Sequence, residues 1–205
     1  MIETLISFSI ATLALAISPG PDNIYVLTQS LVNGTKSGIA TTAGLISGCI
    51  VHTTLLAFGI SAIITASEEL FYGIKILGAC YLFYLAYKVF KSDESIMLTE
   101  NVPKKSFLQL FKTGVIMNLL NPKVMIFFLA FFPGFLWNKE GNTVAQFYIL
   151  GIVFMVISFF TFSTMAFLAG RISKFILKNN GVNLFLKWLQ ILVFSGIALY
   201  IMFDK

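Results

Sequence analysis

Two interruptions in long apolar segments hold the side chains of this sequence that could do chemistry. The first reads Ser18-Pro19-Gly20-Pro21-Asp22-Asn23, and the second reads Asn118-Leu119-Leu120-Asn121-Pro122-Lys123. Each places one ionisable residue beside a proline, far from the ends of its apolar segment. A charge in hydrocarbon is costly and usually faces a pathway or a partner. The two breaks therefore indicate a polar site inside a membrane.

The prolines also release backbone carbonyls from their helices. Proline has no N–H, so the carbonyl four residues before it loses its helical donor. In the first break the freed carbonyls are those of Leu15 and Ile17. In the second, Pro122 frees the carbonyl of Asn118. Within a bilayer, such groups are tolerated only where protein surrounds them or where they line a polar cavity.

A new helix begins after each break. We expect the first to restart at about Asp22, where Asp or Asn is a good N-cap, after a free turn at Gly20. In the second, Asn121 stands at the cap position. Helix N-termini attract anions, while freed carbonyls and an acidic side chain attract cations. This combination suits a zwitterionic amino acid, with its carboxylate at the helix N-terminus and its ammonium at the carbonyls.

The side chains at the breaks have predicted roles in such a site. Asp22 is the expected cation or proton site, and Lys123 is either its ion-pair partner or a contact for a carboxylate. The simpler alternative is that Asp22 caps a kinked helix and Lys123 extends to the surface. We favour binding, because both breaks carry such a residue. The candidate substrate- and proton-binding residues are Asp22, Asn23, Asn118, Asn121 and Lys123, and the helix-break residues are Pro19, Gly20, Pro21 and Pro122.

His52 lies near the middle of the second apolar segment, beside Thr53 and Thr54. It could relay protons, because the reference pKa of histidine is near neutral. We favour a neutral histidine that is hydrogen-bonded within the helix bundle. In the same segment, Gly44 and Gly48 form a GxxxG motif, which allows close helix contact. That contact is either internal or between two copies of the chain, and we favour internal packing.

The composition places the chain in a membrane. Of its 205 residues, 58% are hydrophobic and 11% are charged, and the mean hydropathy is +0.89. Soluble domains average roughly 45–50% apolar and about 25% charged residues. The net charge of +5 does not indicate nucleic-acid binding, because most basic residues lie in short loops between apolar segments. We expect one transmembrane domain over residues 1–205 in a lipid bilayer, without a cofactor or a metal.

Six segments are apolar enough to cross a bilayer. They span roughly residues 3–33, 37–66, 69–90, 106–136, 144–168 and 183–203. The first and fourth would each be ~46 Å long as straight helices, against about 30 Å of hydrocarbon. They must therefore tilt or break, and the prolines mark where. The sequence predicts an all-α membrane protein of six transmembrane helices, with spans one and four broken at prolines.

A polar linker at residues 92–105 divides the chain into two halves, 1–91 and 106–205. Each half holds one broken span followed by two ordinary ones, so the second half enters the membrane from the opposite side. An offset of 101 positions aligns Pro21-Asp22 with Pro122-Lys123. These features predict an inverted three-plus-three repeat, an arrangement that places transporter sites at mid-membrane.

Basic residues gather in the loops after spans one, three and five, and the opposite loops are mainly acidic. By the positive-inside rule, both termini face away from the cytoplasm. The basic loop residues are Lys36, Lys88, Lys91, Lys104, Lys105, Arg171, Lys174 and Lys178.

The sequence resembles the LysE/RhtB family of bacterial amino-acid exporters. The resemblance is carried by Ser18-Pro19-Gly20-Pro21-Asp22, by Gly38 to Gly48, by Gly78-Ala79-Cys80-Tyr81-Leu82 and by Asn118-Leu119-Leu120-Asn121-Pro122-Lys123. It extends over nearly the whole chain. It implies export of an amino acid or similar metabolite through the bacterial cytoplasmic (inner) membrane, driven by proton antiport, and it allows a homodimer. It does not identify the substrate.

Two other functions remain open at this point. A transmembrane thiol-redox shuttle would need paired cysteines, but Cys49 and Cys80 fall in spans two and three, where we expect them to lie away from the breaks. A passive channel is the second alternative. Other enzymatic chemistry is not indicated, because the sequence offers neither a nucleophile–base set nor a cluster of metal ligands.

Overall fold

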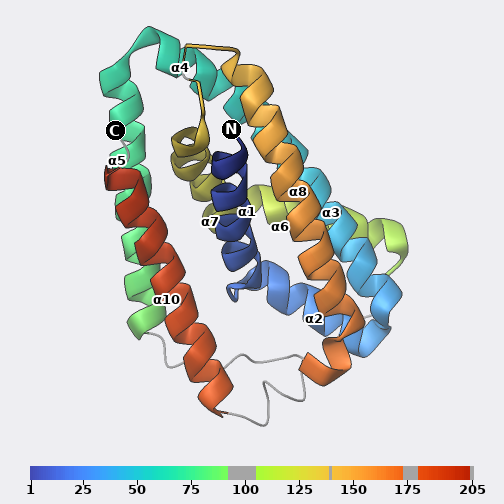
Figure 1. Cartoon of the computed structure of the whole chain (residues 1–205). Helices are drawn as coiled ribbons and strands as arrows, with labels where there is room; N and C mark the ends of the chain where they lie inside the picture. The colour runs from blue at the N-terminus through green and yellow to red at the C-terminus, as the bar shows by residue number, and fades with distance from the viewer. Residues whose placement is uncertain (92–104, 139, 173–179, 204–205) are drawn as a thin grey trace.

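The computed structural model describes residues 1–91, 105–138, 140–172 and 180–203, and its elements are helical (Figure 1). Of the predicted linker 92–105, all but Lys105 lies outside the described residues. The helices in chain order are α1 (Ile2–Ile17), α2 (Pro21–Asn33), α3 (Thr35–Leu55), the π-helical turn η1 (Leu56–Ile60), α4 (Ser61–Ala66), α5 (Glu68–Lys91), α6 (Phe107–Leu120), α7 (Pro122–Ile126), the π-helical turn η2 (Phe127–Phe131), the 3-10 turn η3 (Phe132–Phe135), α8 (Thr143–Phe167) and α10 (Asn180–Phe203).

Both predicted breaks are present. The α1–α2 pair bends by 59°, and the pair formed by α6 and the segment Pro122–Phe135 bends by 53°. Four further helical segments are long and apolar enough to span a bilayer, so the described residues hold six spans when each bent pair counts as one. These findings confirm an all-α membrane protein whose first and fourth spans break at prolines.

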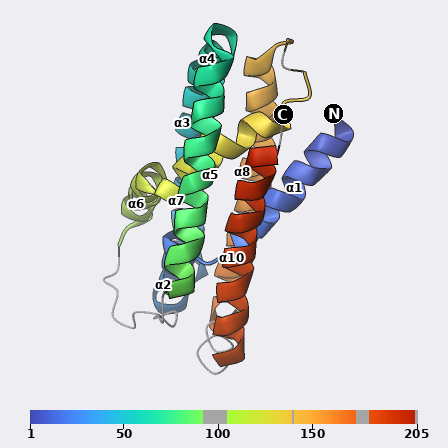
Figure 2. The same ribbon diagram turned by 90° about the vertical axis from the view of Figure 1, so that its left-hand side faces the viewer.

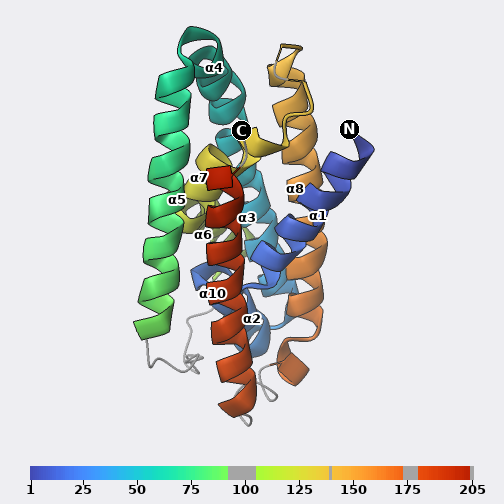
Figure 3. The same ribbon diagram turned by 60° about the vertical axis from the view of Figure 1, so that its left-hand side comes forward.

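The two halves pack against each other in a crosswise pattern. α3 packs against α6 of the other half, and α8 packs against both α1 and α2. α5 and α10, the third helices of the two halves, run side by side (Figures 2 and 3). α6 runs across the bundle rather than along it (Figure 1). The contact of α3 with α6 has its counterpart in the contact of α8 with α1, as expected if a pseudo-two-fold axis related the two halves. The inverted repeat stays a prediction.

The helix ends sort by charge along the bundle. The C-terminal ends of α2, α5 and α8 lie at the lower end of Figure 1, and the N-terminal end of α1 and the C-terminal end of α10 lie in its upper part. Lys36, Lys91 and Arg171 adjoin those three helix ends. Three of the basic loop residues, Lys104, Lys174 and Lys178, lie outside the described residues.

Small residues allow α3 and α6 to touch. The Cα of Gly44 lies against the backbone of Phe111, and Gly48 lies against the side chain of Asn118. From the other side, Gly114 of α6 lies against the backbone of Thr41 and Leu45. The GxxxG motif therefore serves internal packing, as predicted, and it holds the second break against α3.

We predict that Gly44→Ala destabilises the protein by about 1–3 kcal/mol, the usual cost of overpacking. The added methyl group would collide with the Phe111 carbonyl, which belongs to the backbone and cannot rotate away. The melting temperature of the detergent-purified protein would fall. Gly73→Ala on α5 is the control, because open space surrounds Gly73. Equal melting temperatures for the two variants would contradict the close α3–α6 contact.

Candidate functional site

The two breaks meet and bond to each other. The Asn121 side chain donates a hydrogen bond to the Asp22 carboxylate, with Nδ2 3.0 Å from Oδ2. In return, the Lys123 ammonium donates to the backbone carbonyls of Ser18, at 2.9 Å, and Leu15, at 3.3 Å. Residues about a hundred positions apart thus form one polar centre. Its charged groups come from both halves of the chain.

Lys123 supplies the donor that Pro19 took away. The Leu15 carbonyl lost its helical partner to that proline, and the lysine ammonium now bonds it. The side chain is half-buried and passes over the Phe194 ring, with Nζ 5.5 Å from the ring centre. The side chain turns inward, so the alternative in which it extends to the surface is wrong. Its charge compensates the carbonyl oxygens of the first break.

The expected N-cap role of Asp22 is wrong. The α2 helix begins one residue earlier, at Pro21, and Gly20 is its N-cap. Gly20 is extended, with φ −173° and ψ 174°, so the break does not use the conformational freedom of glycine. Since no capping bond occupies Asp22, its carboxylate is available to the polar centre. Only 5% of Asp22 is exposed, and its Oδ1 atom is buried without a hydrogen-bond partner.

Asn23 joins the two helices of the first break. Its Nδ2 atom donates to the Ala16 carbonyl at 2.6 Å, across the bend from α2 back to α1. The same atom lies 3.6 Å from the sulfur of Met165 on α8. Asn121 acts similarly in the second break, where it caps α7 by accepting from the Lys123 N–H. The cap predicted at Asn121 is therefore present.

Asn118 is held by α3. The ring Nε2 of His52 lies 3.3 Å from the Asn118 carbonyl, the group that Pro122 freed. The side chains of Asn118 and Cys49 also contact each other, with Nδ2 and Sγ 3.5 Å apart. His52 packs on the Phe128 ring at 5.4 Å between centroids. His52 is hydrogen-bonded within the bundle, as we favoured, whereas the expectation that Cys49 lies away from the breaks is wrong.

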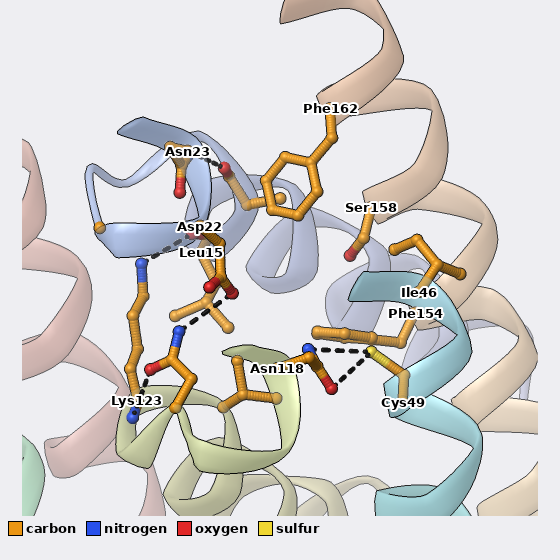
Figure 4. A pocket seen from close by; sticks show the side chains of 14 residues that line it. Leu15, Asp22, Asn23, Ile46, Cys49, Asn118, Lys123, Phe154, Ser158 and Phe162 are labelled. Carbon is orange, nitrogen blue, oxygen red and sulfur yellow. Dashed lines mark hydrogen bonds between the residues drawn. The ribbon is translucent and has the colours of Figure 1, made fainter. Parts of the chain in front are cut away.

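A small cavity of about 30 Å³, partly open to the outside, lies where the breaks meet (Figure 4). One side is polar, with Asp22 and Lys123, and the opposite side carries Ser158, Ile46 and Cys49 (Figure 4). His52 is not among the lining residues. The lining residues are Leu15, Ala16, Gly20, Asp22, Asn23, Ile46, Cys49, Asn118, Asn121, Lys123, Val124, Phe154, Ser158 and Phe162. All five candidate binding residues therefore face one cavity.

Sequence reasoning missed the α8 wall of the cavity. Phe154, Ser158 and Phe162 recur every four residues and so share one helix face. Phe154 rests on the aromatic core, with its ring centre 5.0 Å from that of Phe128. In the sequence, this wall is visible only as one serine between two phenylalanines, each four residues away. That pattern does not by itself show that the stripe faces the breaks.

A multi-pass helical membrane protein with a polar cavity between two broken helices belongs to the class of membrane transporters. The model of the LysE type translocator family matches residues 13–204, and the chain belongs to that family. Membership places the protein among transporters rather than enzymes.

Two similar proteins carry the name of an efflux protein. The chain is 30% identical over 174 residues to the homoserine/homoserine lactone efflux protein of Salmonella typhimurium strain LT2, covering 85% of this chain and 84% of the relative. It is 29% identical over 156 residues to the leucine efflux protein of Salmonella choleraesuis, covering 75% and 73%. It is also 29% identical over 187 residues to the Bacillus subtilis membrane protein YrhP, covering 87% and 88%. No solved structure matches the chain.

We predict that Asn23→Ala destabilises the protein by about 1–3 kcal/mol, because the buried Ala16 carbonyl would lose its donor. The melting temperature in detergent measures the loss. Thr113→Ala is the control, since the Thr113 hydroxyl makes its bond on an exposed face of α6. A variant as stable as the wild type would mean that Asn23 does not hold the first break together.

Proposed function

We propose that the protein is a secondary transporter that exports an amino acid or a related metabolite from the cytoplasm by proton antiport. The observation that carries the proposal is the cavity between the breaks, into which a buried acid and a lysine converge. Family membership supports transport, and the names of two relatives include homoserine, homoserine lactone and leucine efflux. These names favour export of amino-acid-like compounds without selecting one.

The charges in the cavity match a zwitterion. Asp22 has one carboxylate oxygen bonded to Asn121 and a second, buried oxygen without a partner. An ammonium group placed at the second oxygen would satisfy it. The Lys123 ammonium and the N-terminal N–H groups of α2 would attract the substrate carboxylate. Both contacts are short-range, so they require the substrate to lie between the two breaks.

Proton coupling follows from the burial of Asp22. A carboxylate out of water is costly unless a cation compensates it. Two species can compensate the charge of the Asp22 carboxylate in turn. They are the ammonium group of the substrate and a proton. We propose that Asp22 carries a proton when the site is empty and faces the cytoplasm, and gives it up when substrate binds. Exchange of the two species at one group gives antiport, because neither can bind while the other is present.

Movement would come from the two halves, residues 1–91 and 106–205, rocking about the breaks. In such a motion the contacts of α3 with α6 and of α8 with α1 and α2 would have to shift, because they join the two halves. We propose that the basic lower end of Figure 1 faces the cytoplasm of a bacterium, across its inner membrane, and that both termini lie outside. The cavity is formed by one chain, so the homodimer that the resemblance allows is not needed to complete it.

The two alternative functions, a thiol shuttle and a passive channel, are addressed by different observations. A thiol shuttle gains no support, because Cys49 is buried at the cavity whereas Cys80 is exposed on α5, and the two are not bonded to each other. A passive channel is distinguished by energetics, since a channel cannot move a substrate against its gradient. Efflux that continues against a concentration gradient and stops on addition of a protonophore would favour antiport.

We predict that Asp22→Asn abolishes this concentrative efflux, by at least about a hundredfold, because the amide can neither carry the proton nor pair with the ammonium. The measurement is efflux from cells preloaded with a panel of labelled amino acids, with and without a protonophore. Glu3→Gln, at an exposed position in the first turn of α1, is the control. Undiminished, protonophore-sensitive efflux in the Asp22 variant would remove Asp22 from the mechanism.

We also predict that Lys123→Met raises the substrate concentration for half-maximal efflux about tenfold or more, because the carboxylate loses its charged partner. Methionine keeps an unbranched, flexible stem but removes the ammonium and its contact with the Phe194 ring. Lys112→Met, on the exposed face of α6, is the matched control. If both variants had the wild-type half-saturation, Lys123 would have only a structural role.

A further inference from the structure

The hydroxyl of Ser158 has no partner, although it lies inside the protein. Only 2% of Ser158 is exposed, and its Oγ atom is buried without a hydrogen bond. Several other helix hydroxyls in the described residues bond the carbonyl four residues before them, as Thr161 does on the same helix at 2.8 Å. That local bond is the usual solution for a serine or threonine in a helix. Ser158 leaves it unused.

The unused hydroxyl faces the cavity of the proposed transport site. Six serine and threonine hydroxyls in the described residues are buried without a partner, and of these only Ser158 lines the cavity. In Figure 4 the Ser158 oxygen points into the space across from Asp22. The cavity thus has two unsatisfied oxygens, Asp22 Oδ1 at one side and Ser158 Oγ at the other. Each is a place where a ligand would gain a hydrogen bond.

The wall around Ser158 is apolar. The rings of Phe154 and Phe162 flank it one helical turn away on either side, and Ile46 faces it from α3. Asp22 and Lys123 are the charged residues among the cavity lining, and both belong to the breaks. A second charge on the substrate side chain would therefore lie against apolar groups, which is costly. A single neutral polar group on the substrate side chain would have one hydrogen-bond partner there, the Ser158 hydroxyl.

We infer that the cavity selects amino acids whose short, uncharged side chain carries a hydroxyl group, and that Ser158 determines this specificity. This inference rests on the proposed function. The α-ammonium and α-carboxylate occupy the side of the breaks, and the side chain extends towards α8. Its hydroxyl then bonds Ser158 Oγ between the two rings. The cavity of about 30 Å³ must widen to admit either kind of substrate. An apolar side chain of the same size would take the same place but would leave the buried serine unsatisfied.

The experiment compares pairs of substrates of equal size that differ by one hydroxyl: serine and 2-aminobutyrate, threonine and valine, and homoserine and norvaline. Initial efflux rates are measured from cells preloaded with each labelled compound. The wild type is expected to favour the hydroxylated member of at least one pair by about fivefold, which corresponds to one neutral hydrogen bond. Lysine and glutamate are expected to leave at background rates.

Ser158→Ala should bring the preference within the discriminating pair close to one, mainly by slowing the hydroxylated member. The variant should fold, because alanine removes a hydroxyl that bonds nothing in the protein. Ser158→Thr keeps a hydroxyl and should retain the preference. Ser163→Ala is the matched control, because Ser163 is on the same helix with a buried, unpartnered hydroxyl but does not line the cavity.

The outcomes separate this inference from the proposal on which it rests. If the wild type exports no amino acid of any kind, the proposed function itself fails. If the wild type exports amino acids but prefers the apolar member of every pair, or exports lysine as fast as threonine, the specificity inference alone is overturned. It is also overturned if Ser158→Ala keeps the wild-type preference, or if Ser163→Ala loses it equally.

Discussion

The architecture depends on one constraint, which is that a backbone carbonyl deprived of its helical donor must find another partner inside a membrane. Prolines create this need in both breaks. The Leu15 carbonyl of the first break depends on a group from the other half, whereas the Asn118 carbonyl of the second also accepts the Asn121 backbone N–H at 3.1 Å. The Lys123 ammonium from the second break bonds the Leu15 carbonyl of the first. His52 on α3 lies at the freed Asn118 carbonyl of the second break. Because an unsatisfied group in hydrocarbon costs several kcal/mol, these bonds fix the two breaks against each other and against α3.

The same constraint explains why the cavity is polar on one side and apolar on the other. Groups that complete the broken backbones, such as Asn23, Asn121 and Lys123, must gather where the helices bend. The intact helices α3 and α8 have no such need, and they present Ile46, Phe154 and Phe162 to the cavity. Ser158 is the exception on the apolar side. A ligand in this space would therefore meet charge at the breaks and one hydroxyl opposite.

Close packing of the helices holds the two breaks in this arrangement. Gly44, Gly48 and Gly114 allow α3 and α6 to approach closely. The backbones of the two helices touch at Gly44 and Gly114, and the backbone of α3 touches a side chain of α6 at Gly48. On the other side of the second break, buried phenylalanines of η2 and η3 pack around Phe8 of α1 and Phe154 of α8. Glycine contact on one face and aromatic packing on the other leave the second break little freedom except to move together with its neighbours.

The sequence by itself determined the membrane class, the six spans, the two breaks and the residues at them, because hydropathy and proline chemistry act locally along the chain. It also determined which carbonyls would lack donors. It did not determine the partners of those carbonyls, the start of α2 at Pro21, or the place of Cys49 and Ser158 at the cavity. These depend on how α3, α6 and α8 rotate about their axes when they pack, which is decided by contacts between residues far apart in the chain. A serine in a phenylalanine-rich helix looks the same in sequence whether it faces lipid, core or cavity, and only the tertiary structure placed it opposite Asp22.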